Sequence, residues 1–399
     1  MSTPAPLPLQ GVRIIAVEQY GAGPFGTQHL ADLGAEVIKI ENPNDGGDVG
    51  RSVGPHFFGP ADSHFYQSFN RNKKSLTLDL KKPEGQEVLH RLVSTADVVF
   101  NNLRGDLPPK LGLTYDALKG INPRIVCGHL SAYGRTGSRA AWPGYDYLMQ
   151  AEAGYLSLTG EPDGPPARMG LSIIDLMTGT TAAMGLLAGV ISARSTGTGR
   201  DVDVSLFDVS LHNLCYLATW YLNAGVMTRR EPRSSHPSLT PSQLYKTQDG
   251  WLFVMCNKEK FWGLFAQALG KPEWATGEQY GNFKARLANR DQLTADIDAV
   301  LQTATTEEWV KRLAGTVPVA PVYDVAQALE SDFVAEQERL LDFAHPQGPV
   351  RMVASPVRVG EHPTRPAPTM GQHTDDLLQD LGFDDAARQA LRQSGVIGT

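Results

Sequence analysis

The chain has 399 residues, of which 41% are hydrophobic and 20% are charged. This length is enough for two or three domains with substantial apolar cores. The formal net charge of −7 and the lack of a lysine- or arginine-rich block argue against nucleic acid as the main partner.

The three cysteines, Cys127, Cys215 and Cys256, lie far apart in the sequence. Their spacing is typical of neither a metal site nor a disulfide framework, so we expect reduced thiols in a cytoplasmic protein that binds no metal. The N-terminal residues lack the basic and apolar pattern of a signal peptide. The longest apolar stretch, 182–191, is expected to be too short to cross a bilayer, so no membrane partner is predicted.

The first half of the chain alternates short apolar strands with helices. Strands are predicted at 12–17, 36–41, 76–80, 98–102 and 124–132, and helices at 27–33, 83–96 and 115–119. Strands that alternate with helices predict an α/β protein with a doubly wound, mostly parallel sheet.

A glycine-rich segment, GAGPFG at 21–26, separates the first strand from the first helix and is predicted to be a turn. It matches G-x-G-x-x-G, and Glu41 stands about 20 residues further on, where dinucleotide-binding sheets carry their ribose-binding acid. Such glycines let the backbone approach a pyrophosphate. The pattern fits an NAD-dependent oxidoreductase, but coenzyme A carries the same pyrophosphate and ribose. A tight βα turn that needs small residues would give the same pattern.

Asp175 is the most informative single residue. A polar stretch rich in glycine and proline leads into Ser172-Ile173-Ile174-Asp175, and a long apolar helix follows to Arg194. Asp175 therefore lies at or beside a helix N-terminus, where free N–H groups and the helix dipole favour the ionised carboxylate. A partly desolvated carboxylate beside a cleft can act as a nucleophile. The alternative is that Asp175 only caps the helix.

The second half of the chain begins with a strand at 201–206 and a further helix. A polar, proline-containing linker or loop then leads to a hairpin at 244–256, whose turn is at Asp249-Gly250. The helices that follow indicate a smaller α+β domain, and later come a strand near 350–359 and helices at 374–381 and 384–394. We predict a large domain from 1–222, a small domain with linkers from 223–325, and a C-terminal segment from 326–399.

Taken in order, these segments resemble the class III CoA-transferases, which include the formyl-CoA:oxalate and carnitine CoA-transferases; the related 2-methylacyl-CoA racemases share their fold. The resemblance covers about residues 9–381. The motifs that carry it are AGP (22–24), LGAEVIKIE (33–41), NRNKKSLTLDLK (70–81), PEG (83–85), ADVVFNNLRG (96–105), LGL (111–113), NPRIV (122–126), PGYD (143–146) and the Asp175 segment.

The resemblance implies a Rossmann-like large domain completed by both chain ends, a smaller inserted domain and an interlocked homodimer. It implies that the substrates are an acyl-CoA and a carboxylic acid, and that coenzyme A moves from one to the other. It places the catalytic aspartate at Asp175, which would attack the acyl-CoA carbonyl and form a mixed anhydride. The CoA thiolate would then form a thioester with Asp175, and the acceptor acid would reverse these steps. Nearby N–H donors would stabilise the charged intermediates.

The resemblance also implies further site residues, each matched to its own position in this sequence. The residues that it places around coenzyme A are Gly21, Ala22, Leu78, Asp79, Leu80, Lys81, Asn102, Leu103, Arg104 and Lys110. Tyr145 and Asp146 match the pair that faces the catalytic aspartate.

Three departures bear on the substrate. Gly21 stands where formyl-CoA transferases carry glutamine, the loop 234–244 has no run of glycines, and Tyr145 stands where the racemases carry their catalytic histidine. The last difference argues against proton abstraction at Cα. The loop and the segment after it are more similar to members that act on C4–C5 dicarboxylates, such as succinyl-CoA-dependent and mesaconyl-CoA enzymes.

A dicarboxylate needs an anchor for its second carboxylate, for which arginine is well suited. The candidates are Arg51, Arg71, Arg135, Arg168 and His236. Three other functions stay open: an intramolecular shift of CoA within a mesaconyl skeleton, an NAD-dependent oxidoreductase, and a protein that binds acyl-CoA without catalysis.

Overall fold

The structure is a computed structural model that describes residues 6–361 and 363–398. The chain forms two compact units. Unit 1 holds the chain up to Ala153, Met169–Cys215 and the chain from Glu338 onward, whereas unit 2 holds Gly154–Arg168 and Tyr216–Gln337. The sequence had placed the boundaries after residues 222 and 325, and it had not assigned 154–168 to the second unit.

A six-stranded sheet forms the centre of unit 1, and every neighbouring pair of its strands is parallel. The strands are β1 (Arg13–Val17), β2 (Glu36–Glu41), β5 (Lys74–Thr77), β6 (Val98–Asn101), β7 (Val126–Ser131) and β8 (Arg200–Ser205). Their order is β5-β2-β1-β6-β7-β8, so the chain changes direction along the sheet between β1 and β6. The predicted α/β class with a parallel sheet is confirmed. In such sheets, ligands bind beyond the carboxyl ends of the strands at this switch point.

Strand β5 occupies 74–77 rather than the predicted 76–80. Three of its four residues are buried, although only Leu76 is apolar. The four residues 78–81 therefore follow the strand and lie beyond its carboxyl end. This shift matters because it moves them to the side of the sheet where ligands bind.

Helix α6 (Ile173–Thr196) is the longest helix of unit 1. Its 24 residues make it long and apolar enough to cross a membrane by length and composition alone. The apolar segment is therefore longer than the stretch 182–191 that the sequence predicted. Half of the most apolar window of α6 is buried, and the helix packs against α1 (Ala22–Asp32), β7 and β8. The core helix of a soluble domain has the same properties.

The contact between α1 and α6 explains part of the glycine-rich segment. Helix α1 begins at Ala22, so the predicted turn at 21–26 is instead the first part of a helix. A Cβ atom on Gly26 would lie 2.4 Å from the carbonyl oxygen of Gly179, and a Cβ on Gly179 would lie 2.4 Å from that of Ala22. These glycines are therefore needed for two helix backbones to touch.

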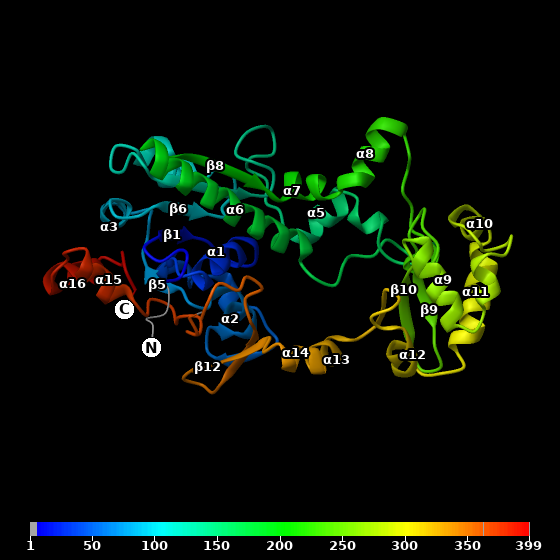
Figure 1. Cartoon of the computed structure of the whole chain (residues 1–399). Helices are drawn as coiled ribbons and strands as arrows, with labels where there is room; N and C mark the ends of the chain where they lie inside the picture. Colours follow the sequence, from blue (N-terminus) through cyan, green and yellow to red (C-terminus); the bar gives the residue numbers. More distant parts are fainter. Residues whose placement is uncertain (1–5, 362, 399) are drawn as a thin grey trace. The chain divides into compact units, whose positions relative to one another are not determined.

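The C-terminal segment packs on the open edge of the sheet, where Figure 1 shows the red helices α15 (Thr374–Asp380) and α16 (Asp385–Gln393) beside β5. The backbone N–H of Thr77 donates to Thr374 Oγ1 at 3.1 Å, and that of Asp79 donates to the carbonyl of Val396 at 2.8 Å. The last part of the chain thus fixes the segment that follows β5.

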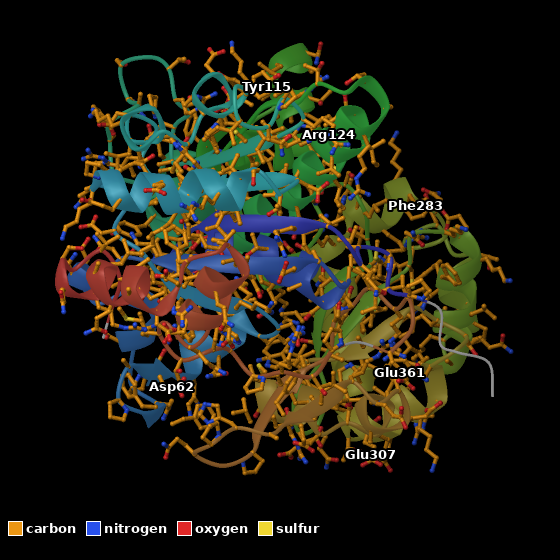
Figure 2. The ribbon with its side chains drawn as sticks, turned by 90° about the vertical axis from the view of Figure 1, so that its left-hand side faces the viewer. Asp62, Tyr115, Arg124, Phe283, Glu307 and Glu361 are labelled. Atoms are coloured by element: carbon orange, nitrogen blue, oxygen red, sulfur yellow. The ribbon has the colours of Figure 1, made fainter. Side chains whose placement is uncertain are left out.

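The other elements of unit 1 cover the sheet and its ends. They are β3 (Phe57–Gly59), β4 (Asp62–Ser63), α2 (His64–Asn70), α3 (Pro83–Val93), α4 (Tyr115–Leu118), α5 (Asp146–Glu152), α7 (Leu206–Asn213), β12 (Leu340–Phe343) and β13 (Val350–Val353). Asp62, labelled in Figure 2, lies 2.8 Å from the Nε2 atom of His345 and ties the β3–β4 hairpin to the returning chain.

Unit 2 has its own sheet and core. The sheet order is β11-β10-β9, and both pairs are antiparallel. Lys246 faces Trp251 across the turn at Asp249-Gly250, which confirms the predicted hairpin. Its elements are α8 (Cys215–Ala224), β9 (Ser242–Lys246), β10 (Trp251–Met255), α9 (Glu259–Ala268), α10 (Phe283–Ala288), α11 (Arg290–Leu301), α12 (Thr306–Leu313), β11 (Val319–Pro321), α13 (Val325–Leu329) and α14 (Asp332–Glu336).

Candidate active site

Two cavities in unit 1 lie at the switch point of the sheet. The first, which we call the Asp175 cavity, has a volume of about 390 Å³ and is bordered by the loops that follow β1 and β6. The second, which we call the Leu78 cavity, has a volume of about 360 Å³. Gln19, Leu103 and Leu107 line both cavities, so the two are adjacent.

Most of the predicted site residues lie around these two cavities. The Asp175 cavity is lined by Gly21, Ala22, Asn102, Leu103, Arg104, Tyr145 and Asp175, and the Leu78 cavity by Leu78, Asp79, Leu80, Lys81 and Leu103. Lys110 and Asp146 are in neither lining. The exposed Lys110 ammonium lies 2.7 Å from Asp106, which also pairs with Arg104.

Asp175 lies in the first turn of α6 and is only 6% exposed. No residue that the structure describes makes a hydrogen bond or ion pair with its carboxylate. Gly21 approaches it so closely that a Cβ there would lie 2.7 Å from Asp175 Oδ2. Because Gly21 has no side chain, there is room beside it for the Asp175 carboxylate.

The N-terminus of α6 is capped by Asp146 rather than by Asp175. The backbone N–H groups of Ile174 and Asp175 both donate to Asp146 Oδ2, at 2.6 and 3.0 Å. Burial, and then the negative charge of Asp146, raise the pKa of Asp175 to about 7. The prediction that the helix end would favour the ionised form of Asp175 is therefore wrong, because those N–H groups already serve another carboxylate.

The loop after β1 is held by the side chain of Asn102. The N–H of Gln19 donates to Asn102 Oδ1 at 2.9 Å, and Asn102 Nδ2 donates to the carbonyl of Gln19 at 2.7 Å. This two-point contact joins the loops that leave β1 and β6. Asn102 lines the Asp175 cavity, but its amide is engaged with the protein backbone.

A buried ion pair also fixes the loop after β1. Lys39 Nζ lies 2.8 Å from Asp48 Oδ2, and both side chains are fully buried. Lys39 also donates to the carbonyl of Glu18 at 2.9 Å, and the N–H of Tyr20 donates to Asp48 Oδ1 at 2.9 Å. The pair therefore forms hydrogen bonds with the backbone of the residues on both sides of Gln19.

Glu41, the expected ribose-binding acid, is committed to the protein. Arg51 donates to its two carboxylate oxygens, both at 2.7 Å, and Ser75 Oγ donates to it at 2.6 Å. Burial would raise the pKa of Glu41, but Arg51, Lys39 and Ser75 lower it to about 2. Since the glycines of α1 serve helix packing and Glu41 is already paired, the NAD-dependent oxidoreductase is not favoured.

The sequence profile of CoA-transferase family III matches residues 9–374. The chain belongs to this family. It is 34% identical to the succinate–glutarate CoA-transferase of Agrobacterium fabrum, with 94% of this chain and 96% of that protein covered. It is 32% identical to the succinyl-CoA:mesaconate CoA-transferase of Haloarcula marismortui, with 94% and 97% covered.

The fold agrees with this assignment. A CaiB/BaiF family protein from Brucella suis has a similar crystal structure, with a TM-score of 0.82, 31% identity, and 94% of this chain and 99% of that chain covered. The predicted resemblance to the class III CoA-transferases is confirmed, and the protein is an enzyme of this class.

The arginines predicted to anchor a second carboxylate do not line either cavity of this CoA-transferase. Arg51 is buried against Glu41, Arg71 pairs with Asp32 at 2.6 Å, and Arg135 pairs with Asp201 and Asp203. The two other candidates, Arg168 and His236, belong to unit 2. The guanidinium that does line the Asp175 cavity is that of Arg104.

Several residues that line the Asp175 cavity were not predicted from the sequence, among them Gln19, Tyr20, Leu107 and Trp142. Gln19 and Tyr20 could have been found, since they stand between the end of β1 and the start of α1 at a switch point. Trp142 had a weaker signal, because it only precedes the PGYD segment.

Proposed function

We propose that this enzyme transfers coenzyme A from an acyl-CoA to a C4–C5 dicarboxylic acid through covalent intermediates on Asp175. One observation carries the proposal: Asp175 is a buried carboxylate without a hydrogen-bond or ion-pair partner among the described residues, and it lines a cavity at the switch point of the sheet. A nucleophile needs these properties, whereas a structural carboxylate would be paired.

The two cavities suit the two ends of coenzyme A. The adenosine would occupy the Leu78 cavity, where 78–81 provide an apolar edge and Lys81. The pantetheine would pass Leu103 and Leu107 into the Asp175 cavity. Arg104 and Lys110, held together by Asp106, would contact the phosphates.

The reaction would begin when the Asp175 carboxylate oxygen attacks the thioester carbonyl. The C–S bond breaks, CoA thiolate leaves, and a mixed anhydride remains. The thiolate then attacks the aspartyl carbonyl, which releases the first acid as a carboxylate and leaves a CoA thioester on Asp175. The acceptor carboxylate attacks this thioester, and the returning thiolate takes the acyl group of the new anhydride, which regenerates Asp175.

Transfer between two acids is favoured over a shift within one molecule. The names of the Agrobacterium and Haloarcula relatives each pair succinate or succinyl-CoA with a different dicarboxylate, glutarate or mesaconate. The pKa of Asp175 near 7 also suits the chemistry, because a carboxylate with a raised pKa is a stronger nucleophile once ionised.

The test is the mass of the intact protein after incubation with succinyl-CoA. Wild type should gain the mass of coenzyme A on Asp175, peptide mapping should locate it there, and glutarate should discharge it. Asp175→Asn keeps the size of the side chain and should gain nothing. A wild-type protein that forms no adduct with several acyl-CoA donors would overturn the proposal and would favour a protein that only binds acyl-CoA.

We also propose that the enzyme is a homodimer. Helix α6 exposes apolar side chains such as Met184 (66%) and Ile191 (70%), and a cavity of about 960 Å³ runs along the same helix. Exposed apolar surface of this kind is typical of protein interfaces. Sedimentation at micromolar concentration should give twice the 43.3 kDa mass of the chain, and a monomer would contradict this proposal.

A further inference from the structure

Tyr20 has an unusual backbone for its residue type. Its φ angle is +69°, in the left-handed region that a bulky side chain rarely adopts. Such a conformation is unfavourable for a bulky side chain and persists only where the surroundings impose it. Here Asp48, which is fixed by its ion pair with Lys39, accepts a hydrogen bond from the N–H of Tyr20 and so holds the backbone of Tyr20 in this conformation.

The strained backbone places the Tyr20 ring on the wall of the Asp175 cavity. The ring packs against Phe65, with centroids 5.1 Å apart, and meets Tyr145 edge-on at 6.1 Å. Burial, and then the nearby charge of Asp175, raise the pKa of the Tyr20 phenol. The hydroxyl is therefore a neutral hydrogen-bond donor near the nucleophile, and none of the described residues is hydrogen-bonded to it.

Few cationic side chains near this cavity are available to bind the second carboxylate of a substrate. Among the residues that line the Asp175 cavity, Arg104 is the one cation, and its guanidinium already pairs with Asp106. The arginines expected to bind a second carboxylate lie elsewhere, as described above. Neutral donors also line this cavity, among them Gln19, Ser131, Trp142 and the phenols of Tyr20 and Tyr145. Tyr20 stands out because contacts with Asp48 and Phe65 fix its backbone and ring, and a phenol O–H can donate to a carboxylate.

We propose that the Tyr20 hydroxyl binds the second carboxylate of the dicarboxylic acid and thereby selects dicarboxylates over monocarboxylates. This inference rests on the proposed transfer through Asp175. Tyr20 would contact the substrate and would determine specificity. Lys39 and Asp48 would be positioning residues that act through the backbone of Tyr20.

The experiment measures the discharge of the Asp175–CoA adduct by two acids of equal chain length, glutarate and valerate. Tyr20→Phe keeps the ring that packs on Phe65 and removes only the hydroxyl. Tyr115→Phe is the matched control, because the exposed Tyr115 hydroxyl, labelled in Figure 2, donates to the carbonyl of Pro123 and Tyr115 lines neither cavity. The concentration of acid that gives half-maximal discharge is determined for both acids as the measure of acid binding.

In Tyr20→Phe this concentration should rise about tenfold or more for glutarate, as expected when a hydrogen bond to a charged group is lost. For valerate it should change by less than about twofold, because that acid has no second carboxylate. Tyr115→Phe should match wild type with both acids.

Two results would overturn the inference: unchanged discharge by glutarate, or equal weakening of both acids, which would make Tyr20 a structural residue. Failure of the wild-type protein to form the adduct is a separate result, which would overturn the proposed function instead.

Discussion

Glu41 and Asp175 are both buried carboxylates, 2% and 6% exposed, yet their surroundings drive their pKa values in opposite directions. Glu41 receives hydrogen bonds from Arg51 and Ser75, and its pKa falls to about 2. The carboxylate of Asp175 has no such partner in the part of the chain that the structure describes, and its pKa rises to about 7. Burial disfavours the charged form in both cases, so the partner decides the outcome. Glu41 is therefore a structural carboxylate, whereas the surroundings of Asp175 are those that the proposed nucleophile needs.

The paired region continues beneath the loop after β1. Lys39, Asp48, Glu18 and Lys73 have fully buried side chains, and Lys73 Nζ lies 2.7 Å from Glu18 Oε1. Ions buried in this way cost several kcal/mol each unless every one is paired. The two regions should therefore respond differently when a single charge is removed.

The largest effect is expected when the paired region loses a cation. Lys39→Met would leave Asp48 buried without its partner, and the free energy of unfolding should fall by about 3–5 kcal/mol. Urea denaturation measures this change. Lys119→Met, which removes the exposed Lys119–Asp116 pair, is the control and should change little. A loss in Lys39→Met as small as that of the control would show that the network contributes no stability.

In the unpaired region, removal of the charge should stabilise the protein. Because folding raises the pKa of Asp175 from 3.8 to about 7, the protonated group favours the folded state, and this contribution is lost as the pH rises through about 7. Asp175→Asn cannot ionise, so its advantage in unfolding free energy over wild type should grow by about 2–3 kcal/mol from pH 5 to pH 8.

Asp175→Ala, which also removes the charge, separates this effect from packing. It should show the same dependence on pH even if its stability at each pH is lower. If the difference between wild type and both variants were constant with pH, the ionised Asp175 would not be destabilised by burial.

The two ends of the glycine-rich segment sharpen the comparison further. In Gly21→Ala the new Cβ would lie 2.7 Å from Asp175 Oδ2 and displace the nucleophile, so kcat/KM should fall about 10–100-fold. In Gly26→Ala the Cβ would instead meet the backbone of Gly179 at 2.4 Å, so stability should fall. Steady-state kinetics and thermal unfolding of both variants test the contrast, which fails if Gly21→Ala retains full activity.

The sequence predicted the parts of this site that depend on local patterns. Apolar runs located the buried strands, and the change from a polar stretch to an apolar helix located Asp175. The predicted bounds of β5 lie too far along the chain, because Leu78 and Leu80 continue the apolar pattern beyond the strand's last residue, Thr77. The start of α1 was also missed, since Gly23, Pro24 and Gly26 suggest a turn when the packing on Gly179 is unknown.

Contacts between distant parts of the chain could not be predicted in this way. Asp146 accepts hydrogen bonds from the N–H groups of Ile174 and Asp175, which lie 28 and 29 residues further along the chain. Asn102 is hydrogen-bonded to Gln19, which is 83 residues away in the sequence. These side chains satisfy backbone groups that a local pattern leaves unassigned. Their identity as site residues came from the family resemblance, but their geometry comes from the fold alone.

Asp146 offers the smallest and most specific test of the unpaired region. Its charge is the second cause, after burial, of the raised pKa of Asp175. Asp146→Asn removes the charge, while its amide oxygen can still accept hydrogen bonds from the N–H groups of Ile174 and Asp175.

The kcat/KM of this variant should depend on pH differently from that of wild type. In wild type the rise of kcat/KM with pH should be centred near 7, because the proposed reaction needs the carboxylate, and in Asp146→Asn this rise should move to lower pH. At pH 6 the variant should be faster by at most about tenfold, and at pH 9 the two should be similar. A profile that stays in place would mean that burial alone sets the pKa, and a profile that moves to higher pH would mean that the cap also stabilises the ionised nucleophile.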